Sequence, residues 1–79
     1  MKPERVFRIG SVSASVFANE IDGDGGKRKI RNVNLQRRYR DGDEWKSTSS
    51  FALPDLPVAI AVLNLALEYV ASQEATIEP

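Results

Sequence analysis

The sequence predicts an α+β domain in which a four-stranded antiparallel sheet is followed by one C-terminal helix (ββββα). The first supporting observation is a series of alternating apolar and polar runs, separated by glycine-containing turns. The second is a change to helical spacing of the apolar residues after Asp55. Because the chain has 79 residues, we expect one domain, 1–79, with the sheet in 6–53, the helix in 55–72 and a frayed tail in 73–79.

We interpret four runs as strands: a short apolar-rich run over residues 6–9 and alternating runs over 11–20, over a segment that includes 32–39, and over 44–53. Gly10 ends the first run, where a bend is favourable because glycine has no Cβ. The segments 22–26 and 41–43 combine aspartate with glycine, which is the composition of a tight turn. Successive runs joined by such short turns predict an antiparallel sheet.

The predicted helix carries two apolar stripes, although a helix on one sheet needs only one. Asp55 has the residue type of an N-cap, and Pro57 fits the first turn. The stripe expected to cover the sheet consists of Leu56, Ile60, Leu63, Leu67 and Val70. A chain this small has no further layer for the second stripe, so we expect a symmetric homodimer. The expected dimer-interface residues are Val58, Val62, Leu65 and Tyr69.

Positive charge is concentrated in one segment, although the formal net charge of the chain is zero. Between positions 27 and 40 the only charged residues are basic: Lys27, Arg28, Lys29, Arg31, Arg37, Arg38 and Arg40. A basic stripe on a neutral body attracts polyanions. A nucleic-acid surface and an ordinary solvated strand are both compatible with this stripe.

The residue types exclude several kinds of chemistry. The chain has no cysteine and no histidine, which excludes Ser-His-Asp and Cys-His catalysis and imidazole-metal sites. Segment 22–26 lacks the ligand spacing of a calcium loop and the Gly-Lys-Ser/Thr of a phosphate loop. We therefore expect that the protein is not an enzyme and that it binds neither a metal nor a cofactor. The absence of an 18-residue apolar run and of a signal-peptide core predicts an intracellular protein, cytoplasmic or in the nucleoid, with no membrane partner.

The sheet face opposite the helix is expected to be polar and free of carboxylates. Its predicted residues are Ser13, Ser15, Phe17, Asn32, Asn34, Gln36, Arg38, Lys46 and Thr48. Hydroxyls, amides and cations beside an aromatic ring are what single-strand-binding proteins use. For Phe17, a platform for base stacking and a contact between two copies of the chain remain two alternatives. Next to the glycine turn, the cations expected to contact phosphate, or else to form a solubilising hairpin tip, are Lys27, Arg28, Lys29 and Arg31.

Three other residues share the phase of Val33 and Leu35, which we expect to face the helix. We expect Trp45 and Tyr39 in the core or in the interface between copies. We expect Arg37 to pair with a carboxylate near the end of the sheet.

Four segments also carry a family resemblance: Phe7-Arg8-Ile9-Gly10, Val33-Asn34-Leu35-Gln36-Arg37-Arg38-Tyr39, Trp45-Lys46-Ser47-Thr48 with Phe51, and Asp55-Leu56-Pro57. In this order they resemble the single-stranded-DNA-binding domain of transcriptional positive cofactor 4 and its small prokaryotic and phage relatives, within the Whirly-like group. The resemblance covers about residues 6–72.

The resemblance implies a homodimer, formed through the helical side, that binds single-stranded or unwound DNA on its sheets. This binding would be largely independent of sequence and would serve transcription, replication or repair. Arg38 matches a basic position of the family's DNA face, Lys46 lies on the partner strand, and Phe17 stands where some relatives have a larger aromatic. Because the chain lacks the serine/lysine-rich regulatory arm of the eukaryotic coactivator, a general single-strand role fits better than activated transcription.

The expected function is therefore single-stranded DNA binding of the transcriptional-coactivator type, with transcription or replication proteins as further partners. Two alternatives remain open. One is a dimeric protein-interaction module whose basic strand receives an acidic partner, and the other is RNA binding.

Overall fold

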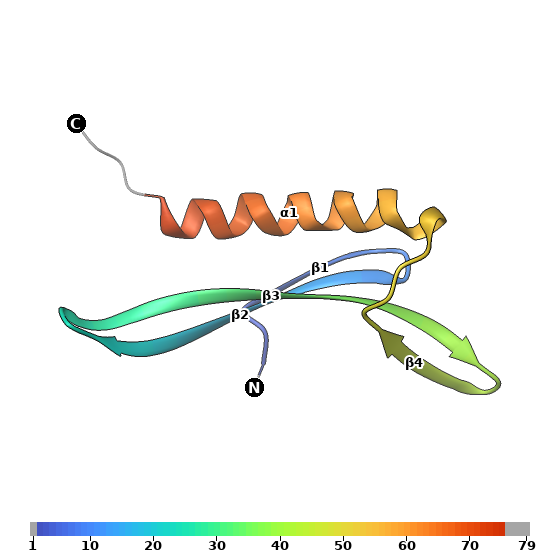
Figure 1. The fold of residues 1–79 in the computed structure, drawn as a ribbon, viewed down its shortest axis with the longest axis horizontal. Helices are drawn as coiled ribbons and strands as arrows, with labels where there is room; N and C mark the ends of the chain where they lie inside the picture. Colours follow the sequence, from blue (N-terminus) through green and yellow to red (C-terminus); the bar gives the residue numbers. More distant parts are fainter. Residues whose placement is uncertain (1, 76–79) are drawn as a thin grey trace.

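The computed structural model of the chain describes residues 2–75 and contains one sheet and one long helix (Figure 1). The elements are β1 (Arg5–Ile9), β2 (Val12–Gly23), β3 (Gly26–Asp41), β4 (Glu44–Thr48), one 3-10 turn (Leu53–Asp55) and α1 (Leu56–Glu74). The strands are antiparallel in the order β1-β2-β3-β4, which confirms the predicted ββββα fold. The helix continues two residues beyond position 72, and residues 76–79 of the expected tail lie outside the described residues.

Two-residue turns connect β2 to β3 and β3 to β4. Gly23 pairs with Gly26 across the β2–β3 turn, and Gly26 has a φ of 111°. Asp41 pairs with Glu44 across the β3–β4 turn, where Gly42 has a φ of 64°. Glycine adopts positive φ without the Cβ clash of other residues, which is why these tight turns form here.

The core lies between α1 and β2 (Figure 1). On β2, every second residue from Val12 to Val16 is buried, as expected for a strand with one covered face. On α1, the buried residues recur at intervals of three and four, as expected for one helical face. The complete core is Val12, Ala14, Val16, Ala59, Val62 and Ala66. Six small side chains make a modest core, since each fully buried valine contributes roughly 1.5–3 kcal/mol.

An ion pair ties the start of α1 to β3. Arg37 Nε lies 3.3 Å from Asp55 Oδ2, and Arg37 Nη2 donates to the Ser50 carbonyl at 3.3 Å. This pair confirms the prediction that Arg37 meets a carboxylate near the end of the sheet. Asp55 precedes α1 as predicted, but its carboxylate accepts the Ala52 N–H at 3.3 Å and makes no capping hydrogen bond to the helix.

The sequence-based assignment of the two helix stripes is wrong. Val62 was expected in the dimer interface, but its side chain is fully buried within its own chain. Val58 and Tyr69 are half-buried against the same core, so only Leu65 of that stripe is exposed, at 41%. The core residues on the helix-facing side of β2 are small: Val12, Ala14 and Val16. The helix therefore packs closely on β2 through its alanines and Val62, and its leucines lie outside this contact.

Apart from Leu65, the large apolar residues left uncovered on α1 form what we call the leucine stripe: Leu56, Ile60, Leu63 and Leu67. These four were predicted to cover the sheet, but they are between 40% and 63% exposed. The fifth residue of the predicted stripe, Val70, is half-buried against the core as expected. The segment Leu53–Glu74, with a mean hydropathy of 1.5, is long and apolar enough to cross a membrane. The core helices of soluble proteins can have the same length and hydropathy. Only 17% of the apolar stretch in Leu53–Glu74 is buried within the chain, so a single chain leaves the leucine stripe exposed to water.

The leucine stripe borders the outer edge of β3. β4 pairs only with residues 37–41 of β3, so within the described chain no strand pairs with the outer edge from 26 to 36. An apolar groove of about 310 Å³ lies here, lined by Val33 of β3 and by Leu63 and Leu67 of the stripe, among others. The uncovered apolar surface is therefore continuous from helix to sheet.

Candidate nucleic-acid interface

The strand register places the predicted polar residues together on the sheet face opposite α1, which we call the open face. Directly paired residues of antiparallel strands point to the same side. The pairs are Ser13–Gln36, Ser15–Asn34 and Phe17–Asn32. They alternate with Val12, Ala14 and Val16, which face the helix. The grouping of these six residues was predicted correctly from the alternation, and their role in binding stays a prediction.

Arginine supplies the positive charge of the open face. The same register adds Arg28, Arg38 and Arg40 from β3, and Arg8 from β1 through its pairing with Ser13. Sequence reasoning missed Arg8, because β1 is too short for its phase to be fixed without the pairing. Among the strand residues that the structure describes, no aspartate or glutamate lies on this face. The open face is therefore electropositive.

A hollow of about 530 Å³ lies on the open face around Phe17. It is lined by Phe17, Asn19, Asn32, Val33 and Asn34. Phe17 is half-buried, so part of its ring stays accessible. A ring beside side-chain amides can stack a planar group and hydrogen-bond its edge, which is the combination that nucleobase recognition requires.

Lys46 and Thr48 were predicted on the open face, and the structure contradicts this placement. They pair with Tyr39 and Arg37, which point to the helix side of the sheet. Lys46 Nζ also lies 3.0 Å from Asp41 Oδ2, so its charge is matched locally. The cause is the turn: a two-residue turn pairs Asp41 with Glu44, whereas the prediction assumed a three-residue turn over 41–43.

The same shift brings Trp45 to the open face, in place of the core or interface position predicted for it. Trp45 pairs with Arg40 and is 61% exposed, the largest exposed fraction of any aromatic residue in the described chain. The guanidinium carbons of Arg38 and Arg40 lie 5.3 and 5.7 Å from the centre of its ring. Tyr39, by contrast, points to the helix side and is 36% exposed. No signal in the sequence alone indicates this exchange, because the turn length decides it.

The basic arm, residues 27–31 beside the glycine turn, is divided between the two faces. The register directs Lys27, Lys29 and Arg31 to the helix side, and only Arg28 to the open face. Arg31 is a structural residue, because its Nε and Nη2 donate to the Glu4 carboxylate at 2.7 and 3.1 Å and its side chain is only 9% exposed. The prediction of Arg31 as a free phosphate contact is therefore wrong.

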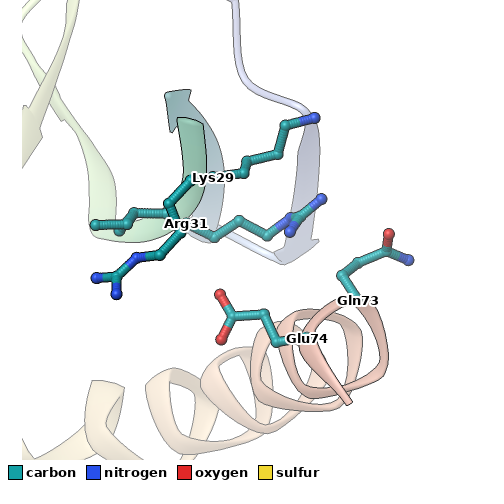
Figure 2. Close-up of a pocket in the computed structure, with 6 residues that line it drawn as sticks. Lys29, Arg31, Gln73 and Glu74 are labelled. Atoms are coloured by element: carbon teal, nitrogen blue, oxygen red, sulfur yellow. The ribbon is translucent and has the colours of Figure 1, made fainter. Parts of the chain in front are cut away.

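A cavity of about 780 Å³ lies between the basic arm and the C-terminal end of α1. Figure 2 shows Lys29 and Arg31 extending from β3 near the last turn of the helix, which carries Gln73 and Glu74. The hydrogen bond that Arg31 donates to the Glu4 carboxylate raises the pKa of Arg31, and the nearby Glu74 carboxylate raises it slightly further. Because this cavity already contains an acidic group, it is less suited to a polyanion than the open face.

The Glu4–Arg31 pair makes the stability of the fold pH-dependent. The Arg31 hydrogen bond lowers the pKa of the Glu4 carboxyl below its ordinary value of 4.5. A carboxyl with a lowered folded-state pKa stabilises the fold above its unfolded-state pKa and loses this contribution as pH falls through the folded-state value. We expect Glu4→Gln to lower the melting temperature at neutral pH and to flatten its decline below about pH 4.5. Thermal melts between about pH 3 and about pH 7 test this, with Glu68→Gln on the exposed side of α1 as the control. Equal pH profiles for Glu4→Gln and wild type would contradict it.

Comparisons of the chain with protein-family models, with curated proteins and with solved structures found no match.

Proposed function

We propose that this protein binds single-stranded DNA on the open face of its sheet and does so as a homodimer. The observation that supports the proposal is the composition of that face: Arg8, Arg28, Arg38 and Arg40 without a carboxylate among the described strand residues, together with Phe17 and its surrounding amides. Phosphate oxygens match the arginines, and bases match the ring and amides.

The position of the helix and the accessible ring of Phe17 favour a single strand over a duplex. Readers of duplex DNA place a helix or a narrow β-ribbon in the major groove, where base edges are accessible. Here α1, the one α-helix among the described residues, is packed on the other side of the sheet (Figure 1). Bases of a single strand are free to turn toward a sheet and stack on exposed rings. Because stacking and backbone charge carry little sequence information, the binding is largely sequence-independent.

The leucine stripe supports the dimer. α1 contains no lysine or arginine between Leu56 and Glu74, whereas helices that lie on anionic membranes have such residues along their polar face. A second copy of the chain would give the stripe an apolar contact surface, because the groove at Val33 can receive leucine side chains of the partner. A shared core also compensates for the modest core of the single chain.

The direct test measures fluorescence anisotropy of a labelled, mixed-sequence single strand of about 15 nucleotides. Its duplex, the RNA of the same sequence and heparin serve as competitors across a salt series. We expect the single strand to bind more tightly than the duplex and to stay bound at moderate salt. Equal, weak binding of all polyanions would contradict the proposal and would favour an acidic protein partner. Equal binding of RNA and DNA would extend the proposal to both.

A matched pair of variants tests the assignment of the binding face. Arg38→Gln should reduce the slope of log affinity against log salt by about 0.7, the value for one phosphate contact to a single strand. Lys46→Gln removes a cation from the same hairpin but from the other face, so it should leave the slope unchanged. Phe17→Ala should weaken binding by about 1–3 kcal/mol, the effect of one stacked base. A larger effect of Lys46→Gln than of Arg38→Gln would assign the helix side instead.

A further inference from the structure

The far end of the open face carries a second aromatic site, distant from the hollow around Phe17. We call it the hairpin cluster and define it as Arg38, Arg40 and Trp45. Trp45 is held by the cross-strand pair with Arg40, and both guanidinium carbons lie within 6 Å of its ring centre. Arg40 Nε also donates to the Gly42 carbonyl at 3.1 Å, which fixes its position above the turn. The cluster is therefore built from paired strand positions.

Charge is separated between the two sides of this hairpin. Arg38, Arg40 and Trp45 lie on the open face, whereas Asp41 and Glu44 pair with each other on the helix side. Lys46 is also on the helix side, where it neutralises Asp41. Alternating strand positions thus keep the two strand carboxylates, Asp41 and Glu44, on the opposite side of the hairpin from Arg38 and Arg40. A surface whose only role was solubility would gain nothing from this separation.

Exposure of the tryptophan also requires an explanation. Cation–π contacts at exposed sites are worth about 0.5–1 kcal/mol each, which does not offset leaving 61% of a tryptophan in water. Phe7, Phe51 and Tyr69, by contrast, all pack against the core. An exposed ring flanked by cations suits a ligand that is both planar and anionic, and a nucleotide has both properties.

We propose that the hairpin cluster is a second nucleotide-binding subsite, in which a base stacks on Trp45 while Arg38 and Arg40 contact the adjacent phosphates. This inference rests on the proposed single-strand binding. It adds that the strand runs along β3, from the Phe17 hollow to the β3–β4 hairpin. Asn32 and Arg40 are eight residues apart on β3, which corresponds to about 26 Å at ~3.3 Å per residue. A stacked single strand at ~3.4 Å per nucleotide covers this distance with about eight nucleotides.

Trp45 is the only tryptophan of the chain, so its fluorescence reports on this subsite alone. We expect a single strand of about 15 nucleotides to quench this fluorescence at the same concentrations at which the anisotropy of the labelled strand rises. A strand of about four nucleotides should lose most of this quenching, because it is too short to engage both subsites. Anisotropy that rises without quenching would overturn the subsite and leave the proposed function intact. Absence of any anisotropy change would overturn both.

Variants separate stacking from a structural role of Trp45. Trp45→Ala should weaken binding about 5- to 150-fold, the range expected for loss of one stacked base. Trp45→Phe retains a ring and should recover most of the affinity. Tyr39→Ala truncates an aromatic residue on the helix side of the same hairpin and should change affinity less than twofold (well below the effect of one stacked base). Melting temperatures of all three variants establish that they fold. Equal losses for Trp45→Ala and Tyr39→Ala would overturn the subsite.

Discussion

A Val62→Asp variant is expected not to fold. Val62 is fully buried in the core between α1 and β2, which also contains Val12 and Val16. The substitution removes roughly 1.5–3 kcal/mol of apolar burial and adds an unpaired buried carboxylate, which costs several kcal/mol more. A chain of this length has a stability of about 4–12 kcal/mol at 0.05–0.15 kcal/mol per residue. Far-ultraviolet circular dichroism and thermal melting should therefore show an unfolded chain without a cooperative transition.

The neighbouring position provides the control for Val62→Asp. Ala61 is exposed, so Ala61→Asp introduces the same charge into the same helix turn without burying it. It should cost only the difference in helix propensity, about 0.5–0.7 kcal/mol. Val62→Ala should lie between the two, because it removes methyl groups without adding charge. A folded Val62→Asp protein with a wild-type melting temperature would show that α1 does not pack on β2 through this residue.

A Leu63→Glu, Leu67→Glu double variant should convert the proposed dimer to a monomer. Both residues are exposed in the single chain, at 40% and 63%, so the substitutions should leave the fold of the chain intact. In a symmetric interface each substitution occurs twice, which places four carboxylates in an apolar contact without partners. The test is sedimentation velocity over roughly a hundredfold range of protein concentration, which corresponds to about 2.7 kcal/mol of association free energy. The double variant should sediment as a monomer throughout, whereas the wild-type protein should sediment as a dimer.

Leu65→Glu is the matched control for the leucine stripe. Leu65 has an exposed fraction of 41%, close to that of Leu63. It lies about 200° around the helix from Leu67, on the side away from the β3 edge. This variant should stay dimeric. Dissociation by Leu65→Glu, with no effect of the double variant, would assign the interface to the other side of the helix, and a monomeric wild type would contradict the dimer altogether.

The fold was predictable because its periodicities are strong. The alternation of Val12, Ala14 and Val16 fixes both the strand and its buried face, and the glycines at 23, 26 and 42 fix the hairpins. The half of the candidate site that lies on β2 and β3 followed from the same alternation. The partner of Arg37 was also predictable, because a charged residue in an apolar phase needs a carboxylate nearby.

The remaining parts depended on quantities that periodicity does not contain. Both helix stripes are apolar, and the choice between them depended on how closely α1 approaches the small residues of β2. The positions of Trp45 and Lys46 depended on the number of residues in one turn. The loss of Arg31 from the site depended on Glu4, which is 27 positions away in the sequence.

The length of the β3–β4 turn has a consequence for how such a protein can evolve. Inserting one residue beside Gly42, if the pairing of β3 were kept, would exchange every side chain of β4 between the two faces. Lys46 and Thr48 would then occupy the open face, and Trp45 would turn toward the helix side. A single-codon insertion can thus replace an aromatic surface by a cationic one while the strands and their hydrogen bonds persist. Related chains that differ by one residue at this turn should therefore differ in ligand preference more than their substitutions suggest.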